Sequence, residues 1–283
     1  MDAFSRTKGV MRIAFIGGGN MARAIIGGLI AKGTAADNLL AVEIDPIARL
    51  KLVAEFGITA LEAPSPILAG ADAVILAVKP QNMREAAGAA APFLADPLFV
   101  SIAAGIRLGD LSRWLGGRRR LVRAMPNTPA LVHAGITGLF APEGVAEGDR
   151  EAAQALLGAV GATVWFDREA DLDAVTAVSG SGPAYVFYAM EALEAAARDL
   201  GLADGAARSL ALWTFVGAAK LAIERNEDPA VLRAQVTSRG GTTERAVQVL
   251  EQAQVRERFV EAVRAACERS RELGEALGKD TPE

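Results

Sequence analysis

The sequence of 283 residues has little of the side-chain chemistry on which many catalytic and metal sites depend. It contains one cysteine, Cys267, and one histidine, His133. A single cysteine excludes an intramolecular disulfide, and this pair leaves no basis for a His/Cys metal cluster, so no metal site is predicted. We interpret Cys267 as a small residue on an apolar helical face and His133 as a structural residue.

The sequence also lacks an excess of either charge and any long apolar run. It has 30 Lys and Arg against 34 Asp and Glu, a formal net charge of -4, which gives no electrostatic reason to expect nucleic acid or an acidic membrane as a partner. No apolar run reaches the roughly 18 residues of a membrane-spanning helix. Residues 1–10 lack the apolar core of a signal peptide, so we expect a disordered leader and a cytoplasmic protein.

What the sequence does contain is a glycine cluster between an apolar strand and a helix. Residues 13–16 predict a buried strand, Gly17-Gly18-Gly19 a tight turn, and residues 20–32 a helix. The first glycine allows the sharp turn, the third leaves the backbone open to a pyrophosphate, and Ala22 lets helix and strand pack closely. The amides at the start of the helix then face the anion. This order predicts a dinucleotide-binding βαβ unit.

Further apolar runs predict a mainly parallel sheet. The expected strands cover residues 39–44, 58–60, 73–78, 98–102, 121–125, 136–141 and 163–166. Ligands of such sheets bind at the carboxyl ends of the strands, where Lys79 is placed to contact a cofactor ribose; an ordinary surface lysine is the alternative. Asp45 follows the second strand and is predicted to accept the ribose hydroxyls, and a helix N-cap before Pro46 explains it about as well.

The pattern changes after Asp167, because no further strand signal appears and the rest reads as helices. The predicted fold is therefore an α/β Rossmann domain with a doubly wound sheet at 11–167, followed by an all-α domain at 168–283. Loops at 179–183 (S-G-S-G-P) and 237–243 (T-S-R-G-G-T-T) each open a helix and suit a carboxylate or phosphate, with plain helix caps as the alternative. Residues 209–223 are apolar almost all round, so we infer an interlocked homodimer that buries them.

Five motifs in this order resemble those of one enzyme family, the pyrroline-5-carboxylate reductases, the last enzymes of proline biosynthesis. They are F-I-G-G-G-N-M-A at 15–22, A-V-K-P-Q at 77–81, M-P-N-T-P at 125–129, D-A-V-T-A-V-S-G-S-G-P-A-Y at 173–185 and T-S-R-G-G-T-T-E-R-A at 237–246. The resemblance covers residues 11–274. It implies NAD(P)H-dependent reduction of the cyclic imine 1-pyrroline-5-carboxylate to L-proline. It also implies a helical domain that forms dimers, which can assemble into larger rings such as a decamer.

The resemblance also implies roles for particular residues. The residues predicted to bind the cofactor include those at the strand ends. They are Gly17, Gly18, Gly19, Asn20, Met21, Asp45, Ala77, Val78, Lys79, Pro80, Ala104 and Asn127. Those predicted to bind the substrate are Ser238, Gly240, Gly241, Thr242 and Thr243. Amides of this second loop would hold the substrate carboxylate, and the Thr243 hydroxyl, the predicted catalytic group, would lie near the imine nitrogen.

Two departures from the family pattern affect these expectations. Arg239 stands where the family often has a proline, which puts the stiffness of the substrate loop in question. Glu43 and Asp45 are acidic where NADPH-preferring members commonly carry small or basic residues. Because an acid repels the 2′-phosphate, NADH is open as the cofactor beside NADPH.

Two other functions are weighed against this one, and the first is that of another Rossmann enzyme, either one similar to a β-hydroxyacid dehydrogenase or one that reduces a different imine. A β-hydroxyacid dehydrogenase needs a lysine facing the nicotinamide; the only candidate in the apolar helix is Lys220, and Glu224 stands where its asparagine partner is expected. The second alternative is a nucleotide-binding regulator without catalysis. The two intact loops of the helical half argue against that alternative.

Hydride transfer to C=N needs no metal, and a threonine hydroxyl suffices beside an iminium that is already electrophilic.

Overall fold

The computed structural model describes residues 11–279, so the leader predicted for residues 1–10 lies outside the described residues. By its internal contacts the chain divides into two compact units. The first, which we call the sheet unit, comprises residues 1–181 and 266–283; the second, the helical unit, comprises residues 182–265. The predicted boundary at residue 168 marks where the strand pattern ends. This domain boundary stays a prediction, since the division into two units rests on contacts between residues and not on where the strands end.

The sheet unit is built on one eight-stranded sheet with the order β3-β2-β1-β4-β5-β6-β7-β8. The strands are β1 (Ile13–Ile16), β2 (Leu39–Val42), β3 (Thr59–Leu61), β4 (Ala73–Leu76), β5 (Leu98–Ser101), β6 (Leu121–Met125), β7 (Gly135–Phe140) and β8 (Gly161–Trp165). All neighbouring pairs are parallel except β6 and β7, which are antiparallel. The predicted mainly parallel, doubly wound sheet is thereby confirmed.

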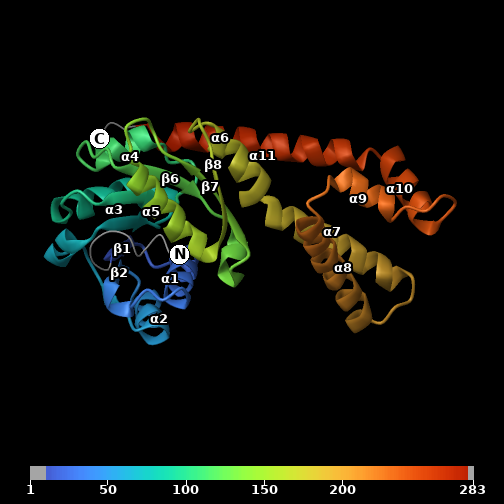
Figure 1. Cartoon of the computed structure of the whole chain (residues 1–283), viewed down its shortest axis with the longest axis horizontal. Coiled ribbons are helices and arrows are strands. Elements are labelled where there is room, and N and C mark those ends of the chain that lie inside the picture. Colours follow the sequence, from blue (N-terminus) through green and yellow to red (C-terminus); the bar gives the residue numbers. More distant parts are fainter. Residues whose placement is uncertain (1–10, 280–283) are drawn as a thin grey trace. The chain divides into compact units, whose positions relative to one another are not determined.

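Helices cover both faces of this sheet (Figure 1). They are α1 (Asn20–Ala31), α2 (Pro46–Phe56), α3 (Met83–Ala90), α4 (Leu108–Trp114), α5 (Glu147–Leu157) and α6 (Asp171–Val175), with short 3₁₀ turns between several of them. One core packs Phe15 and Ile25 with Leu156. The core on the other face packs Leu76 with Met83 and Leu111. Strands β1 and β4 are buried along their whole length, which is why each is a continuous apolar run.

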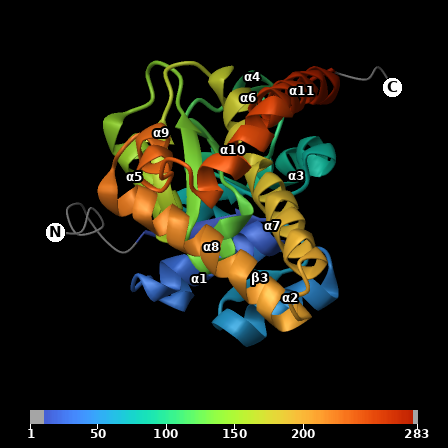
Figure 2. The same ribbon diagram turned by 90° about the vertical axis from the view of Figure 1, so that its right-hand side faces the viewer.

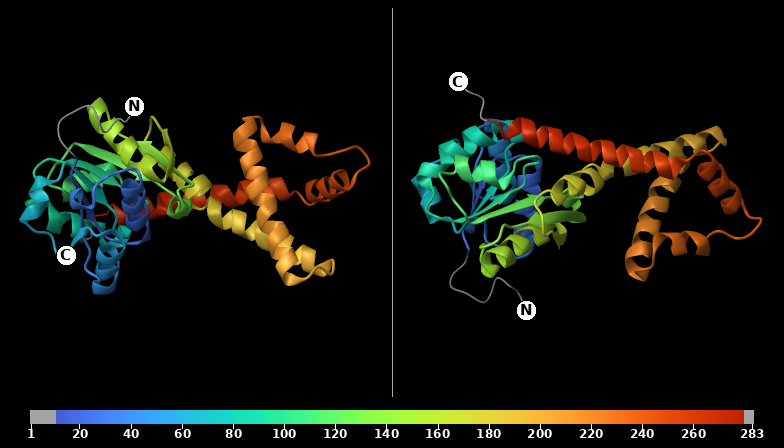
Figure 3. Two further views of the ribbon diagram at one scale, coloured as in Figure 1. Left: turned by 60° about the horizontal axis from the view of Figure 1, so that its bottom comes forward. Right: turned by 90° about the horizontal axis from the view of Figure 1, so that it is seen from above.

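The helical unit contains four helices and the start of a fifth. They are α7 (Gly182–Asp199), α8 (Asp204–Arg225), α9 (Pro229–Gln235), α10 (Thr242–Gln252) and α11 (Val255–Leu277). Helices α7 and α8 contact each other along the unit (Figure 2). The ring of Tyr185 on α7 meets Phe259 on α11 edge to face, with centroids 5.7 Å apart. Figure 3 shows α11 as one unbroken helix, whose last residues belong to the sheet unit.

Within the sheet unit, the end of α11 is fixed by a buried hydrogen bond. The hydroxyl of Ser270 donates to Oδ1 of Asp173 on α6 at 2.7 Å, and both residues are buried. Gly274 lies against Gly105, where a Cβ on Gly274 would come within 3.0 Å of the Gly105 carbonyl oxygen. Leu277 packs on the core that includes α3 and α4. The C-terminal turns of α11 are therefore an integral part of the sheet unit.

Helix α8 is largely exposed in a single chain. Only Ala207 and Ala211 are buried on it, whereas Trp213 is 66% exposed and Ile223 is 80% exposed. By length and composition alone α8 could cross a membrane, although the sequence has no uninterrupted apolar run long enough for a membrane-spanning helix. One such helix is weak evidence for a membrane span. Among the described residues of one chain, α7 covers only part of the apolar surface of α8, which agrees with the inferred dimer.

Candidate functional site

The predicted dinucleotide site begins at the turn between β1 and α1. Gly17 has a φ of +101°, and a Cβ there would lie 2.8 Å from the carbonyl carbon and oxygen of Ala77. Both observations require glycine, since the conformation and the close approach each exclude a side chain. The contact joins the ends of β1 and β4. In the strand order these two strands flank the point where the chain reverses direction across the sheet, which is where such folds bind ligands.

Gly19 has a different reason to be glycine. A Cβ at this position would meet nothing within 4 Å, so no protein atom requires its absence. Gly19 is exposed and is the N-cap of α1, and no side chain caps that helix. The amides of Asn20 and Met21 therefore open onto free space at the positive end of a helix of 12 residues. This surface fits a pyrophosphate, as the sequence predicts.

The two acidic residues after β2 make different contacts. Glu43 accepts hydrogen bonds from the amide of Gly18 at 2.6 Å and from the amide of Asp45 at 2.8 Å. The carboxylate of Asp45 instead accepts from the amides of Ile47 and Ala48, both at 3.2 Å. The N-cap interpretation of Asp45 is thus confirmed, while its role at the ribose stays a prediction. Glu43 is the acid that contacts the glycine turn.

The segment after β4 forms the other side of this edge. Ala77 and Val78 lie against Gly17, and Pro80 begins a short 3₁₀ turn (η4, Pro80–Asn82). The side chain of Lys79 is exposed. Ala104 is half-buried in the turn after β5. These residues lie at the carboxyl ends of adjacent strands, as the sequence predicts, although their contacts with a cofactor remain untested.

Asn127 follows β6 and is buried, with both ends of its side chain bound to protein. Its Oδ1 accepts from the amide of Ile136 at 2.9 Å, and its Nδ2 donates to the carbonyl of Ser179 at 3.1 Å. Asn127 therefore links the M-P-N-T-P turn to the S-G-S-G-P loop. The sequence placed it among the cofactor residues and offered no signal for this contact.

The predicted substrate loop lies in the helical unit. Gly240 has a φ of +71°, and its amide donates to Glu244 at 2.8 Å. The amide of Gly241 donates to the Ser238 carbonyl at 3.0 Å, so it is engaged within the loop. Gly241 is the N-cap of α10, and no side chain caps this helix. The remaining backbone donors in the first two positions of α10 are therefore the amides of Thr242 and Thr243.

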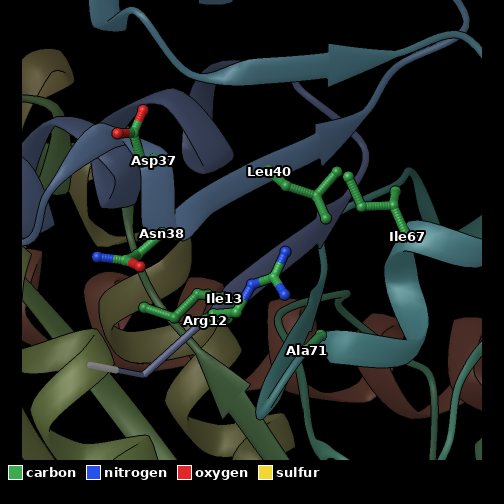
Figure 4. A pocket seen from close by; sticks show the side chains of 7 residues that line it. All are labelled: Arg12, Ile13, Asp37, Asn38, Leu40, Ile67 and Ala71. Atoms are coloured by element: carbon green, nitrogen blue, oxygen red, sulfur yellow. The ribbon is translucent and has the colours of Figure 1, made fainter. Parts of the chain in front are cut away.

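A small cavity at the opposite edge of the sheet is not part of this site. Figure 4 shows its lining, which includes Arg12 and Ile13 at the start of β1 and Leu40 on β2. Its volume is about 10 Å³, enough for no more than a water molecule. It lies at the amino ends of the strands, whereas the glycine turn follows their carboxyl ends.

The strand order, the glycine turn and the open N-terminus of α1 define a Rossmann-type dinucleotide-binding protein. Two family models match the chain: NADP oxidoreductase coenzyme F420-dependent over residues 12–105, and pyrroline-5-carboxylate reductase dimerisation over residues 169–273. The pyrroline-5-carboxylate reductase of Pseudomonas aeruginosa is 48% identical over 270 residues, covering 95% of this chain and 98% of that protein. The chain belongs to the pyrroline-5-carboxylate reductase family.

More distant relatives and solved structures agree. The pyrroline-5-carboxylate reductase of Arabidopsis thaliana is 38% identical over 267 residues, 94% of this chain and 96% of that protein. The structure of a pyrroline-5-carboxylate reductase from Coxiella burnetii superposes with a TM-score of 0.88 at 40% identity, covering 94% of this chain and 99% of that one. Plasmodium falciparum pyrroline carboxylate reductase with NADP bound gives a TM-score of 0.81 at 26% identity, covering 93% and 98%.

Proposed function

We propose that this chain catalyses the NAD(P)H-dependent reduction of 1-pyrroline-5-carboxylate to L-proline, the last step of proline biosynthesis. The observation that carries the proposal is family membership over nearly the whole chain, with 48% identity across 95% of its length. The two alternatives, a β-hydroxyacid dehydrogenase and a regulator without catalysis, have no comparable support.

The cofactor is proposed to lie on the sheet unit, at the ends of β1 and β4. The open amides at the start of α1 and the bare backbone of Gly19 would hold the pyrophosphate. The segment from Ala77 to Pro80 would lie along the nicotinamide. When bound, the cofactor supplies the hydride that the imine carbon accepts. These residues serve to bind and orient it, since the hydride must start close to its acceptor.

The substrate is proposed to bind through its carboxylate at the N-terminus of α10. The amides of Thr242 and Thr243 point out of a helix of 11 residues, where the helix dipole favours an anion. Thr243 is half-buried, and no hydrogen bond to its hydroxyl is found in residues 11–279. The hydroxyl is therefore available to the ring nitrogen, where it would hold the proton in place while the carbon is reduced. The reaction requires this loop as well as the cofactor surface.

A spectrophotometric assay tests the function directly. Purified protein with 1-pyrroline-5-carboxylate is expected to oxidise NADH or NADPH, seen as loss of absorbance of the reduced nicotinamide, and to form proline. Thr243→Ala is expected to lower kcat/KM by about 10- to 100-fold, because a hydrogen bond to a charged group contributes roughly 1.5–3 kcal/mol.

Thr243→Ser is the matched control, because it keeps the hydroxyl. It is expected to retain kcat/KM within about threefold of the unmodified enzyme. Full kcat in Thr243→Ala would remove the assigned role of Thr243 without touching the overall function. Absence of cofactor oxidation with 1-pyrroline-5-carboxylate, but turnover of a β-hydroxy acid, would replace the proposed reaction.

Assembly and location are part of the same proposal. We propose a homodimer formed by the helical domain and a higher ring built from such dimers, for which a decamer is the specific expectation. The match to a dimerisation domain and the exposed apolar surface of α8 support the dimer. A cytoplasmic location is proposed, consistent with a chain whose single cysteine forms no internal disulfide. Light scattering of the purified protein and cell fractionation test these two statements.

A further inference from the structure

The segment between α6 and α7 contains one turn of π-helix, Thr176–Gly180. Its register is set by the amide of Ser181, which donates to the carbonyl of Thr176 at 2.8 Å. Such a turn inserts an extra residue into the helical path and often marks a functional position. Here it also leads to the boundary between the two compact units, which falls between Ser181 and Gly182.

Pro183 takes a hydrogen-bond donor away from this turn. Within the π-helical turn the carbonyl of Thr176 accepts from residue i+5, and where the chain returns to α-helical pairing a carbonyl accepts from residue i+4. For Ser179 the residue at i+4 is Pro183, which has no N–H. Ser179 is half-buried, and a carbonyl that is fully buried without a donor costs about 1–3 kcal/mol. The Nδ2 group of Asn127 donates to the Ser179 carbonyl at 3.1 Å and so supplies the missing bond.

The other contacts of Asn127 give this bond a fixed direction. Its Oδ1 accepts from the amide of Ile136 at the start of β7, which orients the amide group, and the side chain is only 9% exposed. The turn itself packs on the end of β6, because a Cβ on Gly180 would come within 2.7 Å of the Met125 methyl group. The S-G-S-G-P loop is thereby held at the sheet edge where the predicted cofactor residues gather.

We propose that Asn127 is a positioning residue. Its side-chain amide takes the place of the absent Pro183 N–H and holds the π-helical turn against the carboxyl end of β6. Its effect on catalysis is exerted through the backbone of residues 179–182 and not through contact of its side chain with the cofactor. The inference rests on the proposed function only for its activity readout.

Four variants and three measurements test the proposal, the fourth variant being Pro183→Ala alone. Asn127→Asp keeps the acceptor for Ile136 and places an acceptor against the Ser179 carbonyl, Asn127→Ala removes both groups, and Asn127→Ala with Pro183→Ala restores a backbone donor at residue 183. We measure kcat/KM with 1-pyrroline-5-carboxylate, the Kd of NADH and NADPH by fluorescence, and amide hydrogen exchange over residues 176–183. Ser112→Ala is the matched control, because it removes a side-chain hydrogen bond of the same unit, from the Ser112 hydroxyl on α4 to the carbonyl of Arg118 at 2.7 Å, whose partners are not part of α6 or the turn.

Both Asn127 variants are expected to lower kcat/KM by at least about tenfold while the cofactor Kd changes by less than about threefold. Exchange over residues 176–183 is expected to accelerate in both. Ser112→Ala is expected to lower the melting temperature without accelerating exchange in this segment. The double variant is expected to recover most of the loss caused by Asn127→Ala, so the two substitutions are non-additive.

Two results would overturn the proposal. A rise in cofactor Kd that matches the fall in kcat/KM would make Asn127 a cofactor ligand, as the sequence placed it. Losses in the double variant that equal the product of the losses in Asn127→Ala and in Pro183→Ala would show that Pro183 and Asn127 act independently. If the unmodified enzyme reduced no imine at all, the proposed function would fail, whereas hydrogen exchange would still decide the role of Asn127.

Discussion

At the scale of single residues, the acid that contacts the dinucleotide turn is Glu43. Its carboxylate accepts from the amides of Gly18 and Asp45 and is held by both. In Rossmann folds an acid after the second strand accepts the ribose 2′-hydroxyl and leaves no place for a 2′-phosphate. Sequence spacing favoured Asp45 for this role and used Glu43 only as an additional negative charge. The structure favours Glu43 for the ribose contact, because its carboxylate binds the amide of Gly18 in the glycine turn.

We predict that Glu43→Gln shifts cofactor use toward NADPH. The substitution keeps the size of the side chain and removes the charge that repels the 2′-phosphate. The ratio of kcat/KM for NADPH to that for NADH is expected to rise by about 5- to 30-fold, corresponding to roughly 1–2 kcal/mol of relieved repulsion. Steady-state kinetics with both cofactors at fixed ionic strength measures the ratio, because salt screens such repulsion.

Asp45→Asn is the matched control, since it removes the same charge two residues further along the chain. It is expected to change the cofactor ratio by less than about twofold, because the Asp45 carboxylate is bound to the start of α2. A large shift in Asp45→Asn together with no shift in Glu43→Gln would restore the assignment made from spacing.

At the scale of elements, the start of α2 shows a local rule at work. Asp45 caps the helix, Pro46 takes the first helical position, and Gly57 ends it with a φ of +66°. Each residue has the type that its position favours. Such boundaries are readable from sequence because they depend on neighbours within a few positions.

We predict that Asp45→Ala destabilises the sheet unit. Loss of the cap is expected to lower the free energy of unfolding by about 1 kcal/mol. Asn is as good an N-cap as Asp, so Asp45→Asn is expected to remain within about 0.5 kcal/mol of the unmodified protein. Urea unfolding without cofactor compares the two variants. Equal stability of Asp45→Ala and Asp45→Asn would contradict the capping role.

The elements were predicted best from the sequence where a strand is buried on both faces of the sheet. A strand was predicted at each of the eight positions in the sheet, and the continuous apolar run at residues 73–78 covers β4, which is buried along its whole length. The prediction gave no direction for β7, which is antiparallel to β6, because an apolar run is the same in either direction. It omitted α3 and α4, whose 8 and 7 residues are too short for a clear helical period. It also missed the π-helical turn, which depends on Asn127 and Met125 from another part of the chain.

At the scale of the whole molecule, the exposed apolar surface of α8 calls for a partner. Burial of such a helix stabilises a protein by about 25 cal/mol for each Å² of apolar surface covered, and one chain covers little of it. The dimerisation family model spans residues 169–273 and therefore includes this helix. A second copy of the chain is the partner that accounts for both observations.

We predict that Trp213→Asp weakens the dimer. A carboxylate buried without a partner in an apolar interface costs several kcal/mol, so the dimer dissociation constant is expected to rise by at least about 100-fold. Analytical ultracentrifugation over a range of concentrations measures it. Ile44→Asp is the matched control, because Ile44 is 77% exposed on the sheet unit outside the dimerisation match. An unchanged dimer in Trp213→Asp, or equal weakening by Ile44→Asp, would remove α8 from the interface.

The sequence by itself determined the features that depend on short stretches of chain. These are the glycine turn between β1 and α1, the apolar strands, the cap of α2 and the two glycine-rich loops, each set by residue type and local period. The five motifs also sufficed to identify the family. The residues predicted to bind the cofactor follow the carboxyl ends of the strands, because parallel strands bring these ends to one edge of the sheet, while their contacts with the cofactor stay a prediction.

Only the tertiary structure decided which of these parts touch. The contact of Glu43 with Gly18 joins residues 25 positions apart, that of Asn127 with Ser179 spans 52 positions, and that of Ser270 with Asp173 spans 97. No local pattern encodes such pairs, because each depends on how separate elements pack and on which buried polar group lacks a partner. The glycine turn predicts a dinucleotide, whereas the acid beside it and the amide that holds the π-helical turn were found through packing.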